Sequence, residues 1–160
     1  MNFQTMAKQR KFVLIAAAAG IISCFLPWIT ISFGGFGGGS VNGMHSWGLL
    51  AFIAFIGAGV SAFLGDQSKP MASTFWFIAL ACGALAVLGV LIFFLRISSV
   101  SGGLYGGGIG YGFGIWIGAA AAIGVLASAY MFRSPGDSIK GGFDSLKGDI
   151  EKKTDGDPNT

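Results

Sequence analysis

The apolar positions of this chain gather into four long runs that carry no charged residue. The runs cover residues 12–26, 41–65, 72–95 and 97–132. A helix needs about 20 residues to cross the apolar core of a bilayer, and each run can hold one such helix. The expected spans are about residues 11–28, 47–64, 72–95 and 113–132. The fold class predicted from this pattern is an all-α transmembrane four-helix bundle.

Two uncharged, glycine-rich loops join the expected helices, one between the first and second and one between the third and fourth. Residues 29–33 alternate apolar and polar side chains, which is the period of a half-buried strand. Asn42 and Gly43 form a dipeptide typical of hairpin turns. We expect residues 28–33 and 97–101 to pair in a small β-sheet over the helix ends, with the loop glycines at its turns. Loops without regular structure are the alternative.

Charge is scarce and unevenly placed. Charged residues make up 11% of the chain and hydrophobic residues 53%, whereas a soluble domain has about 25% and about 45–50%. Nine of the ten Lys and Arg residues lie away from the glycine-rich loops, and Arg96 is the exception. Because cations favour the cytoplasmic side of a membrane, we expect both termini inside and both loops outside. The bilayer is then the main partner, and no nucleic acid is expected.

Small residues recur four apart on the expected helices, and in lipid such residues let helix backbones approach closely. The longest series is Gly110, Gly114, Gly118 and Ala122. Packing within the bundle is one interpretation, and packing between protomers is the other. Ile31, Phe33 and Trp47 of the first loop are further interface candidates, because an exposed strand edge invites pairing with a neighbour.

The last part of the chain, residues 133–160, is polar and is expected to be a cytoplasmic tail, as are residues 1–11 at the other terminus. Four apolar tail residues recur at spacings of four, three and four, which places them on one helical stripe. They are Ile139, Phe143, Leu146 and Ile150. The pattern predicts a short amphipathic helix that lies on the inner membrane surface or docks on a partner.

The two cysteines, Cys24 and Cys82, lie inside apolar runs, so we expect both to be buried and reduced. Residues 21–24 also fit a lipoprotein cleavage box. The apolar run continues through Trp28, however, whereas a mature lipoprotein normally begins with a polar tether. The interpretation favoured here is an uncleaved first helix, and cleavage before Cys24 is the alternative.

Groups for catalysis are missing from most of the chain. Residues 1–65 and 72–132 contain no Asp or Glu, and the single histidine is His45. Catalysis usually needs titratable side chains gathered in a pocket, and no Cys/His pattern has the spacing of a zinc site. We therefore expect no enzymatic activity, no cofactor and no metal. Ion and proton pathways commonly carry charges within the membrane, and the expected spans have none deep inside them.

Short motifs in the first loop resemble those of a known group of proteins. The motifs are Leu-Pro-Trp at residues 26–28, Val-Asn-Gly at 41–43 and Ser-Trp-Gly at 46–48. The chain resembles small bacterial four-helix membrane proteins of unassigned function, which implies the bacterial inner membrane. Its topology also looks like that of claudin-type tetraspan proteins, whose outer loops form a small sheet. The claudin loop has two cysteines that are absent here, so its barrier function is not carried over.

These observations favour a protein that works by association rather than by catalysis. The outer loops carry almost no charge, the helices have small-residue faces, and the tail is amphipathic. We expect a homo-oligomer or an accessory subunit of a membrane complex. A small oligomeric channel or transporter is the alternative.

Overall fold

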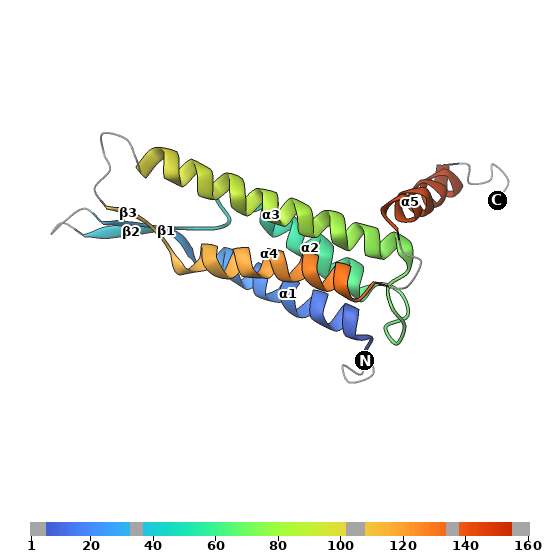
Figure 1. Cartoon of the computed structure of the whole chain (residues 1–160). Coiled ribbons are helices and arrows are strands. Elements are labelled where there is room, and N and C mark those ends of the chain that lie inside the picture. Colours follow the sequence, from blue (N-terminus) through green and yellow to red (C-terminus); the bar gives the residue numbers. More distant parts are fainter. Residues whose placement is uncertain (1–5, 33–36, 102–107, 134–137, 155–160) are drawn as a thin grey trace.

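The computed structural model describes residues 6–32, 37–101, 108–133 and 138–154, which contain five helices and one three-stranded sheet. The helices are α1 (Lys8–Phe25), α2 (Gly48–Phe63), α3 (Ser73–Ser101), α4 (Phe113–Met131) and α5 (Ile139–Thr154). The strands are β1 (Pro27–Ser32), β2 (Gly38–Asn42) and β3 (Ile109–Tyr111). Helices α1 to α4 form an elongated bundle (Figure 1). The sheet lies at one end of it, here called the sheet end, and α5 lies at the other, the tail end.

The largest departure from the sequence prediction is at the end of α3. Residues 97–101 were expected to form a strand, but α3 continues through them to Ser101. Two serines support the extra turn, because Ser98 Oγ donates to the Phe94 carbonyl (3.1 Å) and Ser99 Oγ to the Arg96 carbonyl (2.8 Å). Such bonds satisfy the hydroxyls within the helix itself. The prediction of a strand here was therefore wrong.

The predicted small sheet exists, with different partners for its first strand. Strand β1 is central and pairs antiparallel with β2 on one side and β3 on the other. Pro27 begins β1, a position where its missing N–H costs little. Gly38 and Gly39, expected at turns, instead lie in β2 opposite Ser32 and Ile31. The strand predicted for residues 28–33 is thus confirmed through Ser32, and Phe33 falls outside the described residues.

The bundle buries small side chains and exposes large apolar ones. The buried positions of α2, for example, include Ala51, Ala54, Ala58 and Ala62, whereas Ile53 is 59% exposed. Two of the described helices, α3 and α4, are long and apolar enough to cross a membrane. Helix α2 is apolar but shorter, and the first turn of α1 carries three cations. The structure is thus mostly helical, and by length and composition two of its described helices could cross a membrane.

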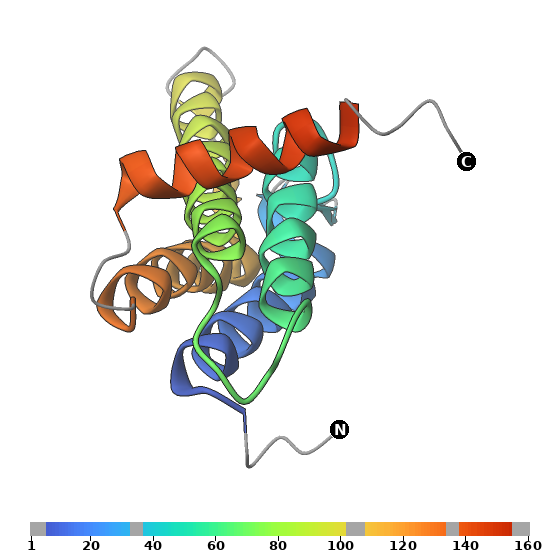
Figure 2. The ribbon, with the colours of Figure 1, turned by 90° about the vertical axis from the view of Figure 1, so that its right-hand side faces the viewer.

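The amphipathic tail helix is present as α5. It lies crosswise over the tail end of α3 (Figure 2). The ring of Phe143 meets the ring of Phe77 edge to face, with 6.3 Å between centroids. Thr74 Oγ1 also donates a hydrogen bond to Asp149 Oδ2 (3.1 Å). The tail helix therefore packs on the bundle of its own chain.

Candidate association and ligand surfaces

Three members of the small-residue series, Gly114, Gly118 and Ala122, lie in α4 and pack within the chain. A Cβ atom at Gly114 would lie 2.6 Å from Trp28 Cδ1, and one at Gly118 would lie 3.0 Å from Ser23 Oγ. Ala122 is completely buried, and Gly110 belongs to β3, opposite Thr30. These contacts give the series the intramolecular role that the sequence left open. Gly114, Gly118 and Ala122 thus pack inside the chain, whereas Gly110 is half-buried in β3.

Trp28 explains why glycine is needed at several of these positions. Tryptophan is a residue type enriched at membrane surfaces, but the side chain of Trp28 is completely buried. Its indole Nε1 donates to the Ser23 carbonyl (2.7 Å), and its ring meets Phe93 edge to face at 4.9 Å between centroids. Gly43 and Gly114 lie against the same indole. A single sequence does not indicate which glycines face which tryptophan, so this core was missed.

A second buried tryptophan, Trp76, packs at the tail end of the bundle. Trp76 is completely buried, and its Nε1 donates to the Ala129 carbonyl (2.8 Å). Gln9 Nε2 donates to the same carbonyl (3.2 Å), while Gln9 Oε1 accepts from the Met71 amide (3.1 Å). These bonds join α1, the start of α3 and the end of α4.

Arg10 adds a third set of bonds at the tail end. It is only 2% exposed. Its Nε donates to the Lys69 carbonyl (3.0 Å), and its Nη1 donates to the carbonyls of Ala62 (3.1 Å) and Leu64. The last carbonyls of a helix lack partners within that helix, and a cation near them is favoured by the helix dipole. The sequence indicated Arg10 only as a cation that orients the chain.

The turn after α2 positions the carbonyl groups to which Arg10 donates. Gly65 has a φ of +85°, a left-handed conformation that favours glycine at a helix end. Asp66 follows, and hydrogen bonds from the side chain and backbone of Ser68 lower the pKa of its carboxyl group. The helix expected over about residues 47–64 accordingly ends at Phe63.

Strand β2 is an unprotected edge of the sheet. It pairs with β1 on one side and has no second neighbour among the described strands. Its first three residues are exposed, and its sequence, GGSVN, contains neither proline nor charge. Proteins usually protect edge strands with such residues, because a bare edge pairs readily with another chain.

The remaining loop candidates have separate positions. Ile31 lies in the central strand and is half-buried, with Gly39 on one side and Ile109 on the other. It therefore belongs to the middle of the sheet rather than to its edge. Trp47 is 41% exposed and lies beside Arg96. Phe33 is outside the described residues.

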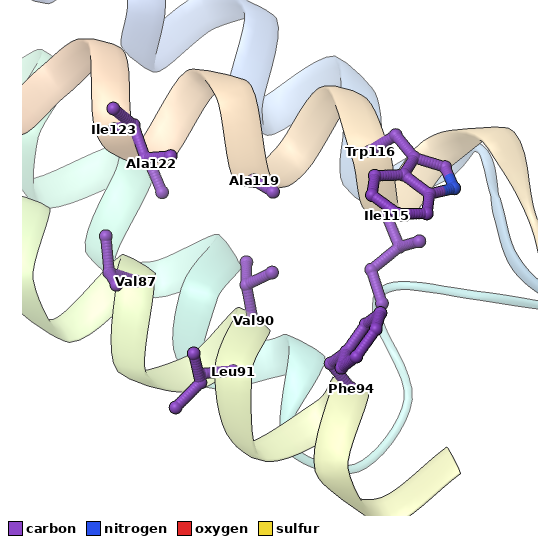
Figure 3. Close-up of a pocket in the computed structure, with 9 residues that line it drawn as sticks. All are labelled: Val87, Val90, Leu91, Phe94, Ile115, Trp116, Ala119, Ala122 and Ile123. Atoms are coloured by element: carbon purple, nitrogen blue, oxygen red, sulfur yellow. The ribbon is translucent and has the colours of Figure 1, made fainter. Parts of the chain in front are cut away.

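An apolar groove runs between α3 and α4, with a volume of about 240 Å³. Figure 3 shows the side chains that line it. Ile115 and Ala122 are buried in it, while Trp116 is 58% exposed. Toward the sheet end the ring of Phe94 stacks on Tyr111, with 4.5 Å between centroids. Its lining suits an apolar chain and supplies no acid, base or metal ligand.

The candidate docking residues of the tail share a stripe that is only partly used. Phe143 contacts Phe77, and Leu146 is half-buried. Ile139 and Ile150 are 62% and 57% exposed. The apolar face of α5 thus contacts α3 through Phe143, and much of that face remains exposed.

Titratable side chains are few and scattered in the bundle and sheet that the structure describes. His45 lies at an exposed turn, with its Nδ1 2.7 Å from Asn42 Oδ1. Cys24 is buried, Cys82 is half-buried, and both are free thiols. Across the described ranges, no three His, Cys, Asp or Glu side chains gather as metal ligands would.

Comparison with known proteins adds no family to this picture. No family model, no curated protein and no solved structure matches the chain. The resemblance to small four-helix membrane proteins and to claudin-type topology therefore stays a prediction.

Proposed function

We propose that this chain is a non-enzymatic integral membrane protein that works by association through its sheet. The main support is the distribution of side chains in the bundle. Large apolar residues such as Ile22, Ile53 and Ile123 are 59–62% exposed, while alanine, glycine and serine fill the interior. Lipid favours this arrangement, because small residues allow close helix packing and large apolar ones face the acyl chains.

All four bundle helices cross the membrane in this proposal, including the two shorter ones. Helices α1 and α2 have 18 and 16 residues, which correspond to about 27 and about 24 Å. Both pack along α3 or α4 over much of their length. Since α3 and α4 suit a bilayer core of about 30 Å, the helices packed against them share the same depth. The sheet then lies outside, and α5 lies on the inner surface.

The orientation can be tested with single cysteines introduced at exposed positions. Thr30, in β1, and Ser145, in α5, are both exposed. In intact cells a membrane-impermeant maleimide should label the T30C chain and spare the S145C chain until the membrane is permeabilised. The unaltered chain is the control for Cys24 and Cys82. Labelling of S145C alone would show that the chain has the opposite orientation. Equal labelling of both variants in intact cells would contradict the membrane placement.

The association surface in this proposal is the free edge of β2. Two copies related by a two-fold axis can pair their β2 strands antiparallel and join their sheets into one. The exposed residues Gly38 to Ser40 add little steric bulk to such an approach. In such a pairing the main-chain hydrogen bonds between the two β2 edges supply the affinity, as in other cases of strand addition.

The strand pairing predicts a specific cross-link. Ser40 is the middle residue of β2, so a two-fold axis near it brings the two Ser40 side chains together. Oxidised membranes that hold the S40C chain should contain a disulfide-linked dimer on a non-reducing gel. T30C, exposed on the central strand, should remain mostly monomeric under the same conditions. A dimer with T30C and none with S40C would move the contact to the face of the sheet.

Size in mild detergent separates the forms of association. A dimer or ring of this chain alone supports self-association. Co-purification of one large complex of fixed composition supports the accessory-subunit form. A ring with a continuous water-filled opening would instead support the alternative that the protein is a channel.

A further inference from the structure

Arg96 is a cation with no acidic side chain near it among the residues that the structure describes. It is the single Lys or Arg between residues 70 and 132, and no Asp or Glu occurs between residues 72 and 132 or before residue 66. Along α3, Ser73 to Arg96 corresponds to a rise of about 35 Å. Asp66 and the acidic residues of α5 belong to the tail end, at the far end of that helix. None of the acidic residues that the structure describes therefore supplies a counter-charge for Arg96.

Arg96 lies at the rim of an apolar groove, which we name the Arg96 groove. Its guanidinium carbon is 5.8 Å from the centroid of the Trp47 ring. The groove has a volume of about 280 Å³. It is lined by Ile29, Ile31, Ser46, Trp47, Phe93, Arg96, Ile97 and Ile109. The groove thus presents one cation beside an aromatic ring, on a lining that is otherwise almost wholly apolar.

We propose that the Arg96 groove binds an anionic phospholipid of the outer leaflet. The phosphate pairs with the guanidinium of Arg96, and the upper part of an acyl chain lies on the isoleucines of the groove. Arginine suits a phosphate because its planar fork can donate two parallel hydrogen bonds. This inference rests on the membrane placement proposed above.

The depth of Arg96 agrees with this ligand. The rise of about 35 Å from Ser73 slightly exceeds the roughly 30 Å apolar core of a bilayer. If α3 enters the bilayer near its first residue, Arg96 emerges at the level of the opposite headgroups. Trp47, beside it, is the residue type enriched at that level.

Charge also excludes a second copy of this chain as the partner of Arg96. The sheet end of another copy has the same sequence, and residues 1–65 and 72–132 contain no carboxylate side chain. The dimer proposed above, paired through β2, therefore brings no carboxylate from the sheet end of the second copy to Arg96. A lipid phosphate supplies the missing anion, and its attached chain fits the apolar lining.

The test measures lipid binding by the purified full chain in an uncharged detergent. Short-chain phosphatidylglycerol and phosphatidylcholine of equal chain length are titrated separately, and binding is followed as the rise in unfolding temperature. We expect phosphatidylglycerol to bind at least about tenfold more tightly than phosphatidylcholine. Arg96→Gln should remove that preference, whereas Arg96→Lys, which keeps the charge, should retain part of it.

Arg133→Gln is the matched control. Arg133 also lies over an aromatic ring, with 4.7 Å from its guanidinium carbon to the centroid of Tyr130, but it belongs to the tail end. This variant should keep the full preference for phosphatidylglycerol. Equal preference in the Arg96→Gln and unaltered chains would overturn the proposal. Equally tight binding of glycerol phosphate would also overturn it, because the groove would then contribute nothing. Neither result bears on the cysteine labelling that tests the membrane placement.

Discussion

Replacing Arg10 by methionine should lower the free energy of unfolding by about 3 kcal/mol. The variant leaves the carbonyls of Ala62, Leu64 and Lys69 without the donor that now bonds them. Each hydrogen bond to a charged group contributes about 1.5–3 kcal/mol, and part of that is recovered where water reaches the vacated carbonyls. The measurement is unfolding of the purified chain in mixed micelles of rising dodecyl sulfate content, followed by tryptophan fluorescence.

Lys8→Met is the control, because it removes the same charge from the same helix. Lys8 is exposed, and a surface change of this kind alters stability by about 0.5 kcal/mol or less. Arg10→Lys should lose an intermediate amount, since one ammonium cannot reproduce the fork of a guanidinium. If the two methionine variants were equally stable, Arg10 would act only as a cation that orients the chain.

The helices were predictable because their signals are local. The length of each apolar run is visible in the sequence itself. Gly65 follows the end of α2, where the left-handed turn favours glycine. The spacing from Ile139 to Ile150 places four apolar side chains on one face, and α5 forms there. These predictions need no knowledge of any distant residue.

The sheet was predictable only in part, because pairing depends on distant residues. The alternation of β1 is local and was recognised, but its neighbours were not. β2 begins with two glycines, which carry no strand pattern, and β3 has only three residues. Residues 97–101 had the β-branched and serine character of a strand, yet their serines bond to the helix behind them. The local pattern fitted both structures, and the helical contacts prevailed.

The candidate surfaces were predicted less well than the fold. Sequence identifies small, aromatic and charged residues, but not what they face. Positions 114 and 118 require glycine because Trp28 lies against them. Position 10 suits a cation because the end of α2 presents carbonyl groups there. In contrast, Arg96 stood out in the sequence as a cation among the glycine-rich loops, and that isolation carries the lipid proposal.

Replacing Trp28 by alanine should cost about 3–5 kcal/mol of unfolding free energy, the range for a buried large aromatic side chain. The indole is completely buried, donates to the Ser23 carbonyl and meets the ring of Phe93. Its removal leaves a void between α1, α3 and the sheet. Gly43 and Gly114 border that void without side chains to fill it, so little relaxation offsets the loss.

Trp116→Ala is the matched control, because Trp116 is 58% exposed on α4 and its loss opens no void. We expect this variant to lose about 1 kcal/mol or less. Trp28→Phe should fall between the two, since it keeps most of the ring and loses the bond to Ser23. All three are compared with the unaltered chain by the same dodecyl sulfate titration, with circular dichroism as the signal so that the missing indole does not affect it. Equal losses for the two alanine variants would mean that Trp28 is no more buried than Trp116, and the packing of the sheet on the bundle would have to be redrawn.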